Sequence, residues 1–124
     1  MDSQIQKYLI DIKQCIEEIE GFLDLKSRQF EVYLNDTMFR RAIERNISII
    51  GEAMTKILQL HPNIHITDAK NIKRCRNYIV HAYDSLDSTI MWAVVIKDLP
   101  ILKADVEALL ISGEDSTNEV TEDQ

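Results

Sequence analysis

An apolar residue recurs every three or four positions through the first 25 residues, and this spacing constrains the fold more than any other feature of the chain. Alternating steps of four and three place one apolar stripe along an α-helix over about residues 3–25. The stripe consists of Ile5, Leu9, Ile12, Ile16, Ile19 and Leu23. Other elements must cover such a stripe, so we expect the helix to form one wall of a bundle rather than an isolated coiled coil.

The low content of turn-forming residues supports a helical fold. Three Gly and two Pro in 124 residues are too few for a β-sandwich or barrel, which turns about every ten residues. The length suits one domain. Cys15 and Cys75 form no disulfide framework, which favours a reducing compartment. We see no signal peptide and no apolar run long enough to span a membrane. These features predict a soluble, cytoplasmic protein.

Residues 37–60 form the second predicted long helix. Asn35 or Asp36 is a suitable N-cap residue, and Pro62 marks the end of the helix. The apolar positions of this helix cover a broad arc. An arc of this width is expected for a helix that faces the core on one side and a second subunit on another.

The remaining segments complete the predicted bundle. Residues 26–34 form a turn or a short helix, and residues 67–83 form the third long helix. The fourth covers about residues 88–111, where Pro100 should kink or restart the helix. The fold class is therefore all-α, an up-down bundle of four long helices within residues 1–112.

The negative charge of the chain is concentrated at its C-terminus. The formal net charge is −7, and residues 113–124 contain five acids and no Lys or Arg. Without those five acids, residues 1–112 have a net charge of −2. We therefore predict a nearly neutral bundle followed by an acidic, disordered tail. A neutral body neither predicts nor forbids a nucleic-acid partner.

One segment of the chain, residues 70–83, combines several chemically active side chains. Its sequence is KNIKRCRNYIVHAY, with four cations in the first seven residues and no acid. These are Lys70, Lys73, Arg74 and Arg76, followed by Asn77, Tyr78, His81 and Tyr83. No cluster of carboxylates suggests a two-metal nuclease, and His61 and His65 lack further ligands nearby. The sequence therefore predicts neither a metal site nor a cofactor.

This set of groups suits the cleavage of an RNA phosphodiester. Histidine titrates near neutral pH and can move protons, while arginine binds two phosphate oxygens and stays charged. On a regular helix Asn77 and His81 share a face, whereas Arg76 and His81 lie about 140° apart. Both reach one site if the Arg side chain wraps round or the helix unwinds near His81. A solvated basic face, with a histidine that complements the helix dipole, remains the alternative.

The motif Arg76–x4–His81–x–Tyr83 resembles the R-x4-H-x-Y motif of HEPN-domain toxins of the HepT family. The resemblance extends beyond the motif to nearly the whole chain, roughly residues 1–111. Residues 36–57 resemble a helix of that family with its IGEA element. Residues 76–110 resemble the closing helices, including the Asp-Leu-Pro within the last one.

The resemblance implies an α-helical, dimeric, metal-independent endoribonuclease that acts as the toxin of a type VII-like toxin–antitoxin pair. Two protomers would build a composite RNA cleft at their interface. Arg76 would bind the phosphate and the transition state, and His81 would be the general acid and base. Asn77 would orient the substrate, and Lys73 and Arg74 are candidate RNA contacts. The expected product carries a 2′,3′-cyclic phosphate.

The resemblance also implies a protein partner. Family antitoxins resemble a minimal nucleotidyltransferase (MntA) that transfers AMP from ATP to the motif tyrosine, here Tyr83. The homodimer would then form a higher assembly with its antitoxin. Two other hypotheses for the function stay open. The protein could be a non-catalytic docking subunit of a nucleotidyltransferase, or a helical dimerisation module without a ligand.

Overall fold

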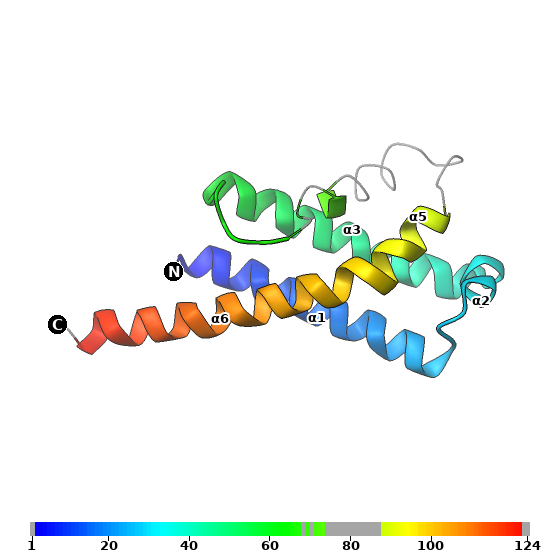
Figure 1. Ribbon diagram of the computed structural model, residues 1–124, viewed down its shortest axis with the longest axis horizontal. Coiled ribbons are helices and arrows are strands. Elements are labelled where there is room, and N and C mark those ends of the chain that lie inside the picture. The colour runs from blue at the N-terminus through cyan, green and yellow to red at the C-terminus, as the bar shows by residue number, and fades with distance from the viewer. Residues whose placement is uncertain (1, 68, 70, 74–87, 123–124) are drawn as a thin grey trace.

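The protein is a bundle of antiparallel helices (Figure 1). The computed structural model describes residues 2–67, 69, 71–73 and 88–122. Regular secondary structure in these residues is entirely helical, as the sequence predicts. The elements are α1 (Ser3–Leu25), α2 (Phe30–Asn35), α3 (Thr37–Leu60), α5 (Ser88–Ala93), the π-helical turn η1 (Val94–Asp98) and α6 (Leu99–Glu122). Helices α3 and α6 both run opposite to α1, and α1 packs against both of them.

Helix α1 has the bounds and the buried face that its sequence predicts. Asp2 caps the helix, because its side chain accepts a hydrogen bond of 2.7 Å from the backbone N–H of Gln4. All six residues of the predicted stripe are buried: Ile5, Leu9, Ile12, Ile16, Ile19 and Leu23. Burial of side chains this large contributes roughly 1.5–3 kcal/mol each, so this stripe is a main source of stability.

Helix α3 also matches its predicted bounds. Asp36 is the N-cap, and its carboxylate accepts a hydrogen bond of 3.0 Å from the backbone N–H of Phe39. The same carboxylate lies 3.2 Å from the ammonium of Lys26. The hydrogen bond from Phe39 and the contact with Lys26 lower the pKa of Asp36. The short helix α2 comes between α1 and α3 in the sequence, in the segment predicted as a turn or short helix.

Most of the predicted third helix, residues 67–83, lies outside the described residues. The predicted fourth helix contains a π-helical turn before Pro100. The backbone N–H of Leu99 bonds to the carbonyl of Val94, five residues earlier. Proline has no N–H, and its ring clashes with the carbonyl four residues before it in a regular α-helix. The wider π turn makes room for the ring. The predicted restart at Pro100 is therefore a π turn, after which α6 begins at Leu99.

The end of α6 differs from the sequence prediction. The helix continues to Glu122, beyond the end predicted near residue 111. It passes through Gly113, because one glycine inside a helix costs only about 1 kcal/mol relative to alanine, and residues 114–122 contain no proline. The division into a bundle at residues 1–112 and an acidic tail at residues 113–124 stays a prediction.

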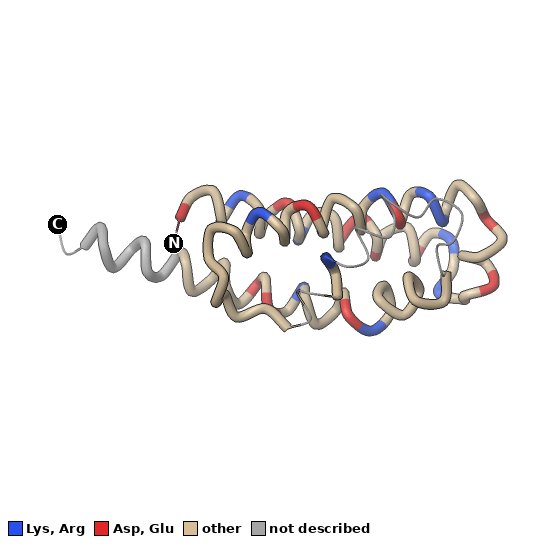
Figure 2. The backbone as a smooth tube through the Cα atoms, turned by 90° about the horizontal axis from the view of Figure 1, so that it is seen from above, with Lys and Arg blue, Asp and Glu red and all other residues tan. Residues whose placement is uncertain are grey.

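The core lies where α1 meets α3 and the α5–α6 segment. Buried residues from α3 are mainly Phe39, Ile43, Ile47, Ile50, Met54 and Ile57, and those from the last segment are Met91, Val94, Val95, Leu99, Leu102 and Val106. Basic and acidic residues are interspersed along the outside of the helices (Figure 2). None of the described helices combines the length and apolar character that crossing a membrane requires.

Candidate functional site

The structure describes one of the six residues that the sequence analysis assigns to the site. Lys73 is exposed at the end of the helical residues 71–73. The other five lie outside the described residues: Arg74, Arg76, Asn77, His81 and Tyr83. Their roles stay predictions, and the described structure shows what holds the two ends of their segment.

The described residues before and after residues 74–87 include buried core residues on both sides. Ile72, directly before Lys73, is fully buried, and Met91 on α5 is almost fully buried. The loop before the segment is tied to α6, because the backbone N–H of Thr67 donates a hydrogen bond of 2.9 Å to the Asp105 carboxylate. The bundle therefore fixes the described residues on either side of residues 74–87.

An aromatic cluster holds α5 against α2. The ring centroid of Trp92 lies 5.0 Å from that of Tyr33 and 6.3 Å from that of Phe30. Phe39 of α3 meets Tyr33 edge-on at 6.2 Å. The hydroxyl of Tyr33 is buried and has no hydrogen-bond partner among the described residues. Burial, with a contribution from the Glu44 carboxylate, raises the pKa of Tyr33.

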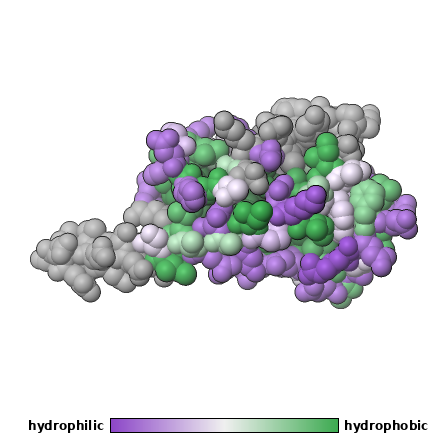
Figure 3. All heavy atoms as spheres, viewed as in Figure 1, coloured by the Kyte–Doolittle hydropathy of each residue, from purple (hydrophilic) through white to green (hydrophobic). Residues whose placement is uncertain are grey.

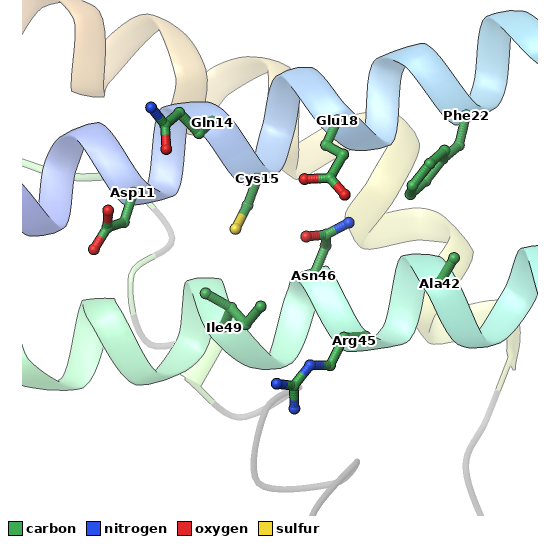
Figure 4. Close-up of a pocket in the computed structure, with 9 residues that line it drawn as sticks. All are labelled: Asp11, Gln14, Cys15, Glu18, Phe22, Ala42, Arg45, Asn46 and Ile49. Carbon is green, nitrogen blue, oxygen red and sulfur yellow. The ribbon is translucent and has the colours of Figure 1, made fainter.

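A cavity of about 430 Å³ lies between α1 and α3. Its lining comes from both helices: Asp11, Gln14, Cys15, Glu18, Phe22, Ala42, Arg45, Asn46 and Ile49. Figure 4 shows the carboxylate of Glu18 and the amide of Asn46 pointing toward one another, with the Cys15 thiol beside them. The guanidinium of Arg45 points away from α1. Polar groups thus face each other across a seam between two helices.

Asn46 is the unusual member of this lining. It is only 5% exposed, and no residue that the structure describes makes a hydrogen bond with its side chain. The buried side-chain atoms that lack a hydrogen-bond partner among the described residues do not include those of Asn46, so its amide reaches the cavity and can bind water there. A ligand that displaces this water can bind the amide.

Two carboxylates, those of Asp11 and Glu18, and one guanidinium, that of Arg45, line the cavity. The pKa of the Cys15 thiol rises to about 11, first because the thiol is buried and then because the Glu18 and Asp11 carboxylates disfavour the thiolate. A cavity of this kind favours ligands that donate hydrogen bonds. In the part of the chain that the structure describes, no group of three His, Cys, Asp or Glu side chains is placed to hold a metal ion.

Sequence reasoning did not identify this cavity. The one available signal was Asn46, a polar residue on the apolar face of α3 between the buried positions 43 and 50. Glu18 gave no signal, because an exposed acid on an amphipathic helix is ordinary. Its approach to Asn46 depends on the register between α1 and α3, which the sequence of either helix alone does not contain.

Comparison with known proteins assigns the family. Residues 12–109 match the family model described as "Ribonuclease HepT-like". A protein named probable ribonuclease HepT, from Thermococcus cleftensis, is 37% identical over 106 residues, covering 82% of this chain and 92% of the relative. A putative RNase from Methanocaldococcus jannaschii is 29% identical over 107 residues, covering 83% and 94%.

A further putative RNase, from Caldanaerobacter subterraneus, is 27% identical over 101 residues, covering 80% of this chain and 90% of the relative. No solved structure matches the chain. The family match covers most of the bundle and includes the whole basic segment, residues 70–83. The chain belongs to the ribonuclease HepT-like family.

Proposed function

We propose that this protein is a metal-independent endoribonuclease that acts in the cytoplasm as the toxin of a toxin–antitoxin pair. The observation that carries the proposal is the family match over residues 12–109, which includes Arg76–x4–His81–x–Tyr83. Relatives along nearly the full chain are named as ribonucleases.

In the proposed reaction the RNA supplies its own nucleophile. A histidine takes the proton of the 2′-hydroxyl, whose oxygen attacks the phosphorus, and a second proton transfer releases the 5′-oxygen as a hydroxyl. His81 suits these transfers because histidine titrates near neutral pH. Arg76 binds the phosphate oxygens and stabilises the negative charge of the transition state. The products are a 2′,3′-cyclic phosphate and a 5′-hydroxyl.

The remaining site residues position the RNA in this proposal. Asn77 orients the substrate, while Lys73 and Arg74 contact neighbouring phosphates. The exposed position of Lys73 at the start of the segment suits such a contact. Three cations near a few phosphates are sufficient for a short cleft in a body that is otherwise nearly neutral.

The active unit in this proposal is a homodimer with a composite cleft. Exposed apolar residues on α5, η1 and α6 support association with another chain. They are Ile90, Ile96, Ile101 and Ile111, each at least 40% exposed. Figure 3 shows apolar patches among polar ones on the face that α5, η1 and α6 cross.

A partner nucleotidyltransferase silences the toxin in this proposal by transferring AMP to Tyr83. The phosphodiester formed on the tyrosine adds negative charge and bulk beside His81. That group competes with RNA for Arg76 and excludes the substrate by charge and volume.

The cleavage reaction is tested with partner-free protein and RNA in excess EDTA. We expect cleavage with cyclic-phosphate ends, and a loss of about 10²–10⁴-fold in rate for His81→Ala. The matched control is His61→Ala, because His61 is exposed in the loop after α3 and lies outside the motif. Equal activity of the two variants contradicts the assigned role of His81. No cleavage by unmodified wild-type protein favours a non-catalytic docking subunit.

The silencing step is tested by mass spectrometry after incubation with the partner enzyme and ATP. Wild-type protein should gain one AMP and lose activity, whereas Tyr83→Phe should stay unmodified. Tyr8→Phe is the control, because Tyr8 lies on α1 outside the motif. Modification of the Tyr83→Phe protein contradicts the proposed acceptor.

A further inference from the structure

The cavity between α1 and α3 contains polar groups that the proposed cleavage chemistry does not use. We infer that it is a subsite for a guanine base of the RNA, held between Glu18 and Asn46. This inference rests on the proposed ribonuclease function and adds a base preference to it. It concerns only described residues, all on α1 and α3.

The facing pair of side chains matches the edge of guanine. Guanine presents two donors, N1–H and the N2 amino group, beside one acceptor, O6. A carboxylate offers two acceptors and an amide offers a donor. The Glu18 carboxylate and the Asn46 amide lie next to one another at the cavity (Figure 4), so a base that enters the cavity can meet acceptors and a donor together. The amide of Asn46, which makes no hydrogen bond with a described residue, exchanges water for the base when the base binds.

The charge of the cavity distinguishes a base from a phosphate. Two carboxylates, those of Asp11 and Glu18, line it together with one cation, Arg45, whose guanidinium points away from α1. An RNA phosphate is repelled by this arrangement, whereas the N–H groups of a base are attracted. The raised pKa of the Cys15 thiol agrees with the same negative potential.

The size and the walls of the cavity also suit a base. Its volume of about 430 Å³ lies within the range of roughly 300–1,000 Å³ that is typical of ligand sites. Phe22 stands at one end of the cavity (Figure 4) and is half-buried. Aromatic rings stack on unpaired bases and hold them in place. Ile49 and Ala42 on α3 complete an apolar wall.

Other bases fit this pair of side chains less well. Adenine and cytosine each present an unprotonated ring nitrogen next to their amino group, and that nitrogen would face the Glu18 carboxylate. Uracil offers one ring N–H between two oxygens. A site that hydrogen-bonds particular donors discriminates against ligands that leave its acceptors unpaired. We therefore expect a preference for guanosine over adenosine, cytidine and uridine.

The test is an NMR titration of the full-length protein with the four nucleosides, which carry no phosphate. Guanosine should shift the side-chain amide signal of Asn46 and the methyl signals of Ile49, and the other three should not. Glu18→Gln should weaken guanosine binding about tenfold or more. The matched control is Glu17→Gln, which makes the same charge change at an exposed residue outside the cavity lining and should bind as wild type does.

Three outcomes overturn the inference: no shift with guanosine, equal shifts with all four nucleosides, or equal binding by both Glu→Gln variants. The inference is also overturned if Glu18→Gln changes the oligomeric state, measured by sedimentation, and leaves guanosine binding unchanged. That result indicates that a second protein chain occupies the cavity.

The result is separable from the cleavage assay. Guanosine binding that depends on Glu18 supports the subsite even if the protein cleaves no RNA. Cleavage of RNA without guanosine binding supports the proposed ribonuclease function and contradicts the proposed guanine subsite. Where both occur, Glu18→Gln should raise KM for guanosine-containing RNA about tenfold or more and leave kcat nearly unchanged.

Discussion

Two regions of this bundle each hold a polar side chain that makes no hydrogen bond with a described residue, and they differ in whether its polar atoms are accessible. At the α2–α5 end, the Tyr33 ring packs against the rings of Phe30, Phe39 and Trp92, and its hydroxyl is buried. Between α1 and α3, the Asn46 amide faces a cavity of about 430 Å³. One site is closed and the other is open.

The buried hydroxyl of Tyr33 only costs stability, whereas the amide of Asn46 can bind a ligand. An enclosed hydroxyl loses its bonds to water and gains nothing in return, so Tyr33 is retained for its ring. An amide at an open cavity keeps its bonds to water, and a ligand can replace that water. Substitutions at the two positions should therefore differ in their effects on stability and on binding.

The largest expected effect is the loss of the Tyr33 ring. Tyr33→Ala should lower the free energy of unfolding by about 3–5 kcal/mol, because the side chain is fully buried and its removal leaves a cavity. Tyr8→Ala is the control, because Tyr8 is only partly buried. Urea denaturation measures both variants. A similar loss at the two positions contradicts the central place of the aromatic cluster.

Removal of the hydroxyl alone should have the opposite sign. Tyr33→Phe should raise the free energy of unfolding by about 1–2 kcal/mol, because the ring stays and the cost of the unpaired hydroxyl disappears. Guanosine binding should not change, since the cavity between α1 and α3 is not lined by Tyr33. A loss of stability in the same denaturation experiment means that the hydroxyl has a partner in solution.

The corresponding change in the cavity should separate stability from binding. Asn46→Leu should change the free energy of unfolding by less than about 1 kcal/mol, because the amide that it removes faces the cavity and can bind water there. It should nevertheless remove the guanosine-induced shift at Ile49. A variant that still binds guanosine shows that Asn46 does not contact the base.

The helices and their buried faces were predictable because their information is local. Apolar spacing and a capping residue define α1 and α3, and both have the predicted bounds. The family motif in residues 70–83 was also visible as a short pattern. These features depend on neighbours within a few turns of one helix.

The features that were not predicted depend on opposing local and packing energies, or on how two helices are aligned in the packed core. Pro100 is accommodated by a π turn, a compromise between the proline ring and continued packing of α5 and α6. The helix beyond residue 111 continues because nothing in that stretch is costly enough to stop it. Glu18 lies opposite Asn46 only because α1 and α3 pack in a particular register. That register is determined by the packed core and not by the sequence of either helix.

The smallest expected effect is on the Cys15 thiol, which reports the potential inside the cavity. In a Cys75→Ser background, alkylation of Cys15 should be slow at neutral pH and still accelerate at about pH 10, because only the thiolate reacts and the pKa of Cys15 is about 11. Glu18→Gln should lower this pKa only slightly, since burial is the largest cause of the shift and the carboxylate the second. Glu17→Gln should leave the rate profile unchanged. If the alkylation rate of Cys15 instead reaches a plateau near pH 9 in the protein with Glu18 intact, the thiol is neither strongly desolvated nor surrounded by negative charge. That result also contradicts the argument that the cavity prefers a base to a phosphate.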